Sequence, residues 1–206
     1  MRPRSPPSRP ATALAYAVQV ALAALVVFTP GVAGPPAFAE YGVAIVVLPA
    51  VVRVVCHRAV TPLQRTWIAA ALGLHALGAV YGLYANWWYD HLTHALSAGL
   101  VVAVVYAVGI AVSRVLPARI STRTLHVVSL SCLLVAGVTW EVYELYVPHL
   151  VVYGAEDTAK DLIFDVVGWV LVAPVHRRLL GRVPDDLTAR LVAHVGHTRP
   201  IPGRAT

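Results

Sequence analysis

The chain has 206 residues, of which 58% are hydrophobic and only 13% charged, and its formal net charge is +6. Soluble globular proteins carry roughly 25% charged residues, so a chain this apolar lacks the polar surface needed to face water on all sides. The composition therefore excludes an ordinary soluble domain and predicts an all-α integral membrane protein.

Apolar segments recur along the chain, and each is long enough to cross a hydrocarbon core of ~30 Å as a helix. We expect six transmembrane helices, at about 11–29, 41–56, 66–85, 91–113, 125–146 and 158–176. They form a bundle within residues 11–180, between an N-terminal tail (1–10) and a C-terminal tail (181–206) that has room for one short surface helix.

The arginines predict the orientation of this bundle. Three precede the first span, three lie at the end of the second span or between it and the third, three lie between the fourth and fifth, and six follow the sixth. Because cytoplasmic loops carry an excess of Lys and Arg, both termini should be cytoplasmic in a multi-pass protein of the cytoplasmic (inner) membrane of a prokaryote. The positive charge is then a topology signal. We expect the lipid bilayer as partner, and no nucleic acid.

The first segment has a second interpretation, as a cleaved signal peptide. A basic start and an apolar stretch are followed by Ala37, Phe38 and Ala39, which resemble a signal-peptidase site. That site lies well beyond the end of the apolar stretch, so we favour a retained span. Cleavage stays open as an alternative and leaves the rest of the topology unchanged.

Acidic residues and histidines gather toward the extracytoplasmic ends of the predicted spans. Residues three or four apart share a helix face, so Asp90 and His94 lie together, with His91 to one side. Three further stripes follow the same rule: His75, Gly78, Gly82 and Ala85; Gly137, Glu141 and Glu144; and Asp157, Asp161, Asp165 and Gly168. Ionisable groups in a membrane cost roughly 2.5–3.5 kcal/mol each, so we expect these to face one another in a shared polar cavity. Small residues in the stripes should let the helices approach closely.

Other polar and aromatic residues are expected at the membrane surfaces. We expect an interfacial aromatic belt formed by Trp87, Trp88 and Tyr89. Five histidines near the interfaces or in the tail are expected to be solvated: His126, His149, His176, His194 and His197. The cytoplasmic half of the bundle would then hold few polar groups, and no path through the membrane is evident.

Several of these residues form an ordered pattern. It comprises His75, Gly78 and Tyr81, then Tyr89, Asp90 and His94, then Glu141 and Glu144, and last Asp157, Asp161 and Gly168. In this order the pattern resembles the YjdF-like family of polytopic inner-membrane proteins, a family of uncharacterised function, over about residues 66–173. The resemblance implies a multi-span membrane fold and this residue list, but no reaction. His91 and Asp165 lie outside the pattern.

Carboxylates and histidines on facing helices are typical metal ligands in helical bundles. We therefore expect a divalent metal ion as cofactor, with ligands among His75, Asp90, His94, Asp157 and Asp161. Such an ion can activate water for chemistry on a lipid or other membrane-embedded substrate. Glu141 and Glu144 are the candidate catalytic residues, one of them as general base.

Two non-enzymatic alternatives stay open. In one, the same residues form a structural ion-pair network, with Asp90 and Asp157 as helix N-caps. In the other, the intramembrane acids and histidines serve ion- or proton-coupled transport. The sequence does not decide whether the protein is an enzyme.

Overall fold

A computed structural model of the chain describes residues 9–28, 60–116, 120–146 and 154–198, together with residues 47 and 50. In chain order its elements are α1 (Arg9–Phe28), α3 (Pro62–Tyr81), the 3-10 helix η2 (Leu83–Ala85), α4 (Trp87–Val115), α5 (Thr122–Glu144), α6 (Ala155–Val172), α7 (His176–Leu180) and α8 (Val183–Thr198). The described residues contain no strand, which confirms the all-α prediction for that part of the chain. The signal-peptidase-like site at 37–39 and nearly all of the predicted second span (41–56) lie outside the described residues.

Among the described helices, α4 and α5 are long and apolar enough to cross a membrane. Composition alone does not mark α6 as a span, because five of its 18 residues are charged. The six spans, the tail boundaries and the cytoplasmic position of both termini therefore stay predictions.

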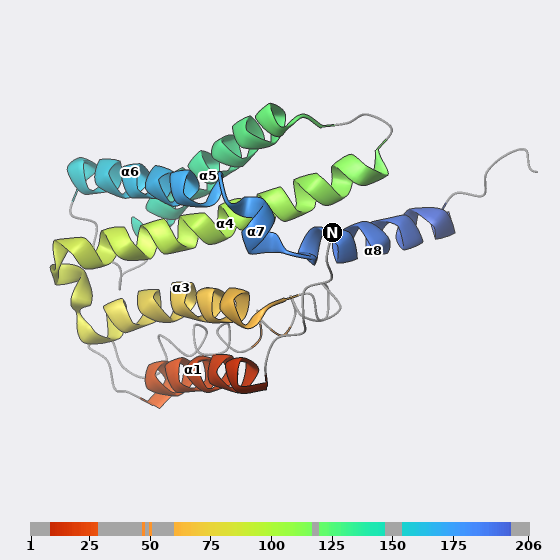
Figure 1. Cartoon of the computed structure of the whole chain (residues 1–206). Helices are drawn as coiled ribbons and strands as arrows, with labels where there is room; N and C mark the ends of the chain where they lie inside the picture. Colours follow the sequence, from red (N-terminus) through yellow and green to blue (C-terminus); the bar gives the residue numbers. More distant parts are fainter. Residues whose placement is uncertain are drawn as a thin grey trace, which may run out of the picture.

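Helix α4 is the centre of the arrangement. It packs against α3 on one side and against α5 and α6 on the other, while α1 packs on α3 (Figure 1). An ion pair of 2.5 Å between Arg114 and Asp185 ties the end of α4 to the start of α8. The C-terminal helix is more than the surface helix that the sequence suggested, because Val183 is buried in the core cluster that surrounds Val102 and Tyr106.

The two ends of α3 have clear local causes. Thr61 and Gln64 form a capping box at its start, with Pro62 in the first turn. The predicted stripe ran on to Ala85, but the helix ends at Tyr81 because Gly82 adopts a left-handed conformation with φ of 65°. The turn that follows brings Tyr84 back over α3, where its hydroxyl donates to the backbone oxygen of His75 at 3.1 Å.

Glycines set the close approach of the helices around α6. At Gly168 a Cβ atom would meet the backbone oxygen of Ala95 and lie 3.0 Å from the Cβ of Ala98. At Gly137 a Cβ atom would meet Oδ2 of Asp165. The prediction that small residues allow close packing is confirmed at both positions.

The outward faces of α5 and α6 are apolar. Val135 on α5 is 68% exposed, and Ile163 and Leu171 on α6 are 59% and 63% exposed. Large exposed aliphatic surfaces mark contact with a membrane or a partner. These faces are therefore available for contact with a membrane or a partner.

Candidate metal site

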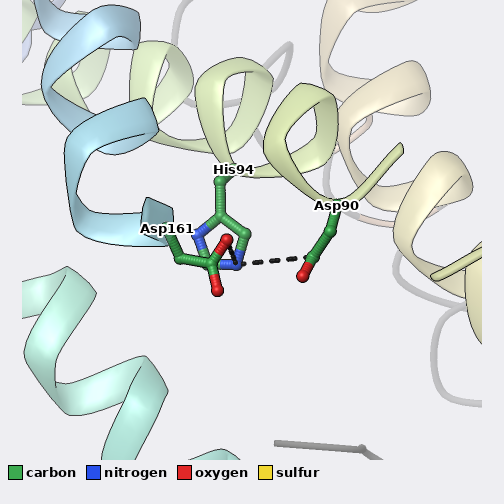
Figure 2. A group of neighbouring side chains, drawn as sticks. All are labelled: Asp90, His94 and Asp161. Atoms are coloured by element: carbon green, nitrogen blue, oxygen red, sulfur yellow. Dashed lines mark ion pairs between the residues drawn. The ribbon is translucent and has the colours of Figure 1, made fainter. Parts of the chain in front are cut away.

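Asp90, His94 and Asp161 meet where the N-terminal part of α4 faces α6. Asp90 lies in the first turn of α4, His94 one turn later, and Asp161 in the second turn of α6. One potential ligand atom from each residue lies within 4.8 Å of those from the other two (Figure 2). Two helices thus bring together three of the five predicted metal ligands.

The three ligand atoms converge without bonding directly. His94 Nε2 lies 3.7 Å from Asp90 Oδ1 and 3.9 Å from Asp161 Oδ1. Both distances exceed the range of a hydrogen bond. An ion about 2.1 Å from each of its ligands in a tetrahedral shell separates them by about 3.4 Å. The two distances from His94 are close to this value and the two carboxylate oxygens lie within 4.8 Å of each other, so a small ion would fit between the three atoms after the group contracts.

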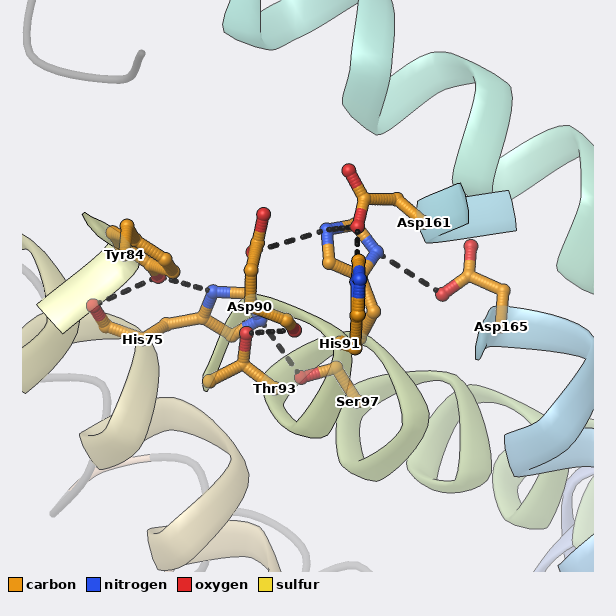
Figure 3. Close-up of polar contacts among 9 residues, drawn as sticks. His75, Tyr84, Asp90, His91, Thr93, Ser97, Asp161 and Asp165 are labelled. Carbon is orange, nitrogen blue, oxygen red and sulfur yellow. Dashed lines mark hydrogen bonds and ion pairs between the residues drawn. The ribbon is translucent and has the colours of Figure 1, made fainter. Parts of the chain in front are cut away.

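A second layer of contacts holds these side chains (Figure 3). His94 Nδ1 lies 3.3 Å from Asp165 Oδ1, and His91 Nδ1 lies 3.3 Å from Asp161 Oδ1. His91 also stacks on Phe164, with ring centroids 4.3 Å apart. The helical spacing of Asp161 and Asp165 predicted that Asp165 faces the site, although Asp165 is not part of the pattern that resembles the family. The sequence did not predict the contact of His91 with Asp161, because this contact depends on how α4 is rotated toward α6.

His75 lies beside this group. Its Nδ1 is 2.8 Å from the hydroxyl of Tyr84, and its Nε2 is 3.1 Å from the hydroxyl of Ser97. Its ring centroid is 6.1 Å from that of His94. Both ring nitrogens of His75 therefore have neutral partners in this structure, and its role as a metal ligand stays a prediction.

The two predicted catalytic residues come from α5. Glu141 is 6% exposed, and its Oε1 is one of the few buried side-chain atoms of the described residues that have no hydrogen-bond partner. It is within electrostatic reach of His94 and Asp165. Glu144, the last residue of α5, is half-buried and interacts electrostatically with Glu141. The structure therefore adds a third helix to the site, while the catalytic roles stay predictions.

The N-cap interpretation of the acids is wrong in its details. The N-cap of α4 is Asn86 and that of α6 is Gly154, whereas Asp90 and Asp157 lie in the first turns of these helices. Acids in a first turn still interact favourably with the helix dipole. Asp157 is half-buried and is not part of the group of three, so its role as a metal ligand also stays a prediction.

The aromatic residues at the start of α4 divide into two kinds. Trp87 and Trp88 are 74% and 52% exposed, as residues of an interfacial belt should be. Tyr89 is only 5% exposed, and its hydroxyl donates to the backbone oxygen of Leu74 at 2.6 Å. Its assignment to the belt is therefore wrong, because the phenol anchors α4 to α3.

A second polar cluster lies further along α4. His176 was expected to be solvated, but it is 5% exposed and stacks on the ring of Tyr106 at 4.2 Å. The Tyr106 hydroxyl bonds His126 Nδ1, and His176 Nδ1 donates to the backbone oxygen of Ala173 at 2.6 Å. The expectation that His176 is solvated is therefore wrong, because the imidazole is packed into the core beside Tyr106.

The other three histidines expected to be solvated are less informative. His194 is exposed, as expected. The side chains of His149 and His197 lie outside the described residues.

One protein family matches the sequence. It is described as "Predicted membrane protein (DUF2238)", and it covers residues 11–182, which include every residue of the candidate site. No curated protein and no solved structure matches the chain. The family match agrees with the resemblance to YjdF-like proteins, and it extends over most of the chain. The chain therefore belongs to this family of predicted membrane proteins.

Proposed function

We propose that this membrane protein holds a divalent metal ion between α4 and α6, with Asp90, His94 and Asp161 as ligands. The observation that carries the proposal is the convergence of His94 Nε2 with two carboxylate oxygens, at 3.7 and 3.9 Å. On its other side, His94 faces the carboxylate of Asp165 at 3.3 Å. A carboxylate behind the second ring nitrogen is the usual support of a metal-bound histidine.

The local charge also supports a cation. Asp161 and Asp165 are 2% and 5% exposed, and Glu141 is 6% exposed. The nearby Lys160 forms its ion pair with Glu156, at 2.7 Å on the exposed surface. Buried carboxylates need positive partners, and the neighbouring histidines supply at most part of this charge. A divalent cation offsets the rest.

The ligand set suggests what the ion does. One imidazole nitrogen and two carboxylate oxygens suit zinc, manganese or iron. Three protein ligands leave positions for water and substrate, as in catalytic metal sites. We propose Glu141 as the general base, because its buried Oε1 has no hydrogen-bond partner within the described structure, and Glu144 as the second candidate. His75 and Asp157 are further proposed ligands.

The proposed setting is the cytoplasmic membrane. Six spans with both termini inside would open the site to the extracytoplasmic side, where a lipid or another membrane-embedded substrate has access. The basis is the family match together with the arginine distribution.

Metal content tests the proposal. The wild-type protein is purified in mild detergent without chelator, beside His94→Gln, Asp161→Asn and the Asp90→Ala/His94→Ala double variant. Asp185→Asn is the matched control, because this acid pairs with Arg114 away from the site. We expect near-stoichiometric metal in the wild type and the control, and its loss in the other variants, by elemental analysis.

A structural ion-pair network is the second candidate, and one observation favours it. Two histidine–acid pairs cross from α4 to α6, His91 with Asp161 and His94 with Asp165, each at 3.3 Å. Folded wild-type protein that takes up no metal, even from zinc- or manganese-supplemented buffer, would decide for this network. In that case His94→Gln would only lower the thermal unfolding temperature.

A further inference from the structure

We propose that a groove between α5 and α6 binds one acyl chain of a membrane lipid, and that the polar end of this lipid reaches the candidate metal site. The inference deepens the proposed function and rests on it, because it names the class of substrate that the metal serves. It follows from the shape and chemistry of the groove and from its junction with the site.

The groove has the chemistry of an acyl-chain site. It has a volume of about 460 Å³ and is lined only by leucine, isoleucine and valine side chains, including Leu134 on α5 and Leu162, Val167 and Leu171 on α6. Leu171 and Ile163 at its edge are 63% and 59% exposed, so it opens sideways. A chain can enter it from the lipid phase without crossing water.

The length of the groove matches one membrane leaflet. Its lining runs along α6 from Leu162 to Leu171. Nine helical steps of 1.5 Å give a length of about 13 Å, and half of a ~30 Å hydrocarbon core is about 15 Å. One acyl chain of one leaflet therefore fits lengthwise.

The groove and the metal site meet at Gly137. A Cβ atom there would lie 2.9 Å from Leu162 Cδ2, in the wall of the groove, and would also meet Oδ2 of Asp165, which supports His94. Because residue 137 has no side chain, Leu162 of the groove and Asp165 of the site both pack directly against the backbone of α5 at this point. Glu141 lies one turn further along α5, with its unpartnered buried oxygen. We therefore place the polar end of the lipid at this end of the groove, near Asp165 and Glu141.

A lipid suits this surface better than a second copy of the chain. Helices that associate in membranes use small residues, which let their backbones approach. Gly137 and Gly168 are both buried against neighbouring helices, and the groove carries only large aliphatic side chains. The groove itself therefore lacks the small-residue surface that a helix partner needs.

Photo-crosslinking tests the inference. The full chain is reconstituted in vesicles of phosphatidylethanolamine and phosphatidylglycerol, with a trace of phospholipid that carries a diazirine on one acyl chain. Crosslinked peptides are identified by mass spectrometry. Val167→Trp fills the groove, and Val135→Trp is the matched control, because Val135 is 68% exposed on α5 and does not line the groove. Leu171→Trp is a second groove-filling variant if Val167→Trp does not fold.

The expected result is crosslinking concentrated on the groove lining of α5 and α6. It should fall by about tenfold in the groove-filling variant and stay unchanged in the control. Uniform labelling of all lipid-facing helices, equal labelling in both variants, or crosslinked dimers through the groove would overturn the inference. Metal content is measured on the same samples. Groove labelling in a wild type without metal would reject the proposed function and leave lipid binding standing, whereas bound metal without groove labelling would reject only the lipid.

Discussion

His94 is the residue on which the candidate site depends, because acids on two helices surround its ring. Asp90 lies on its own helix, and Asp161 and Asp165 reach it from α6. Two of these acids face Nε2 and one faces Nδ1. This division gives the acids different roles, since the group of three potential ligand atoms in the described structure forms on the Nε2 side.

Asp165→Asn tests that division of roles. We expect metal affinity to fall by about 10- to 100-fold and not to vanish, because removing a carboxylate behind a ligating histidine weakens the ligand without removing it. Competition with a fluorescent zinc chelator measures the change. Glu156→Gln is the control on the same helix, since Glu156 is exposed and pairs with Lys160. A loss as complete as that of His94→Gln would instead make Asp165 a direct ligand.

The sequence predicted contacts within a helix better than contacts between helices. The spacing of Asp90 and His94 was sufficient, because residues four apart share a face, and the two side chains do meet. The cross-helix pairs, such as His91 with Asp161, depend on the rotation of α4 against α6. One sequence carries no direct signal for this rotation, so the partner of each histidine became visible only in the structure.

At the scale of elements, α6 has two distinct faces. Asp161, Asp165 and Gly168 are buried toward α4, while Ile163, Val167 and Leu171 are exposed on the opposite side. Packing on α4 holds such a helix in place, because the carboxylates of Asp161 and Asp165 would be unfavourable in contact with lipid. The close approach at Gly168 is therefore a structural requirement of the site.

Gly168→Leu tests the requirement. A side chain at this position would meet the backbone of α4 at Ala95, so we expect a loss of about 1–3 kcal/mol in the free energy of unfolding, as for other overpacked sites. Tryptophan fluorescence during thermal unfolding in detergent measures it. Ala159→Leu adds similar volume at an exposed position of the same helix. Equal unfolding temperatures for the two variants would refute the close-packing account.

The sequence predicted where helices occur better than where they end and how the chain continues from those ends. Gly82 could have been recognised as the end of α3, because glycine favours the left-handed conformation found there. The burial of His176 could not, because it depends on the turn at the end of α6 that leads into α7 and lays the imidazole on Tyr106. Polarity alone assigned this histidine to solvent, and tertiary packing placed it in the core.

At the scale of the whole molecule, the predicted orientation puts the candidate metal site and the arginine-rich surface on opposite sides of the membrane. Lys160 lies near the site, and all of the arginines belong to the predicted cytoplasmic side. The positive-inside rule is statistical, so the orientation needs a direct measurement.

Cysteine accessibility provides it. Lys160→Cys and Thr122→Cys are made separately in a background with Cys56→Ser and Cys132→Ser; both target positions are exposed. A membrane-impermeant thiol reagent applied to intact spheroplasts should label position 160, because we place it outside. Position 122 should react only after permeabilisation. The reverse pattern would invert the topology, and labelling of both in intact cells would reject the assigned spans.

The buried acids of α6 have a consequence for how the protein is made. As the predicted last span, α6 would bring Asp161 and Asp165 into the membrane against roughly 5–7 kcal/mol, at 2.5–3.5 kcal/mol for each acid. Ribosomes synthesise α4 before α6, so His91 and His94 are already in place when these acids arrive. We expect α6 to enter the bilayer as a partner of α4 and not as an independent hydrophobic segment. Insertion of α6 and completion of the histidine–carboxylate cluster are then one and the same event.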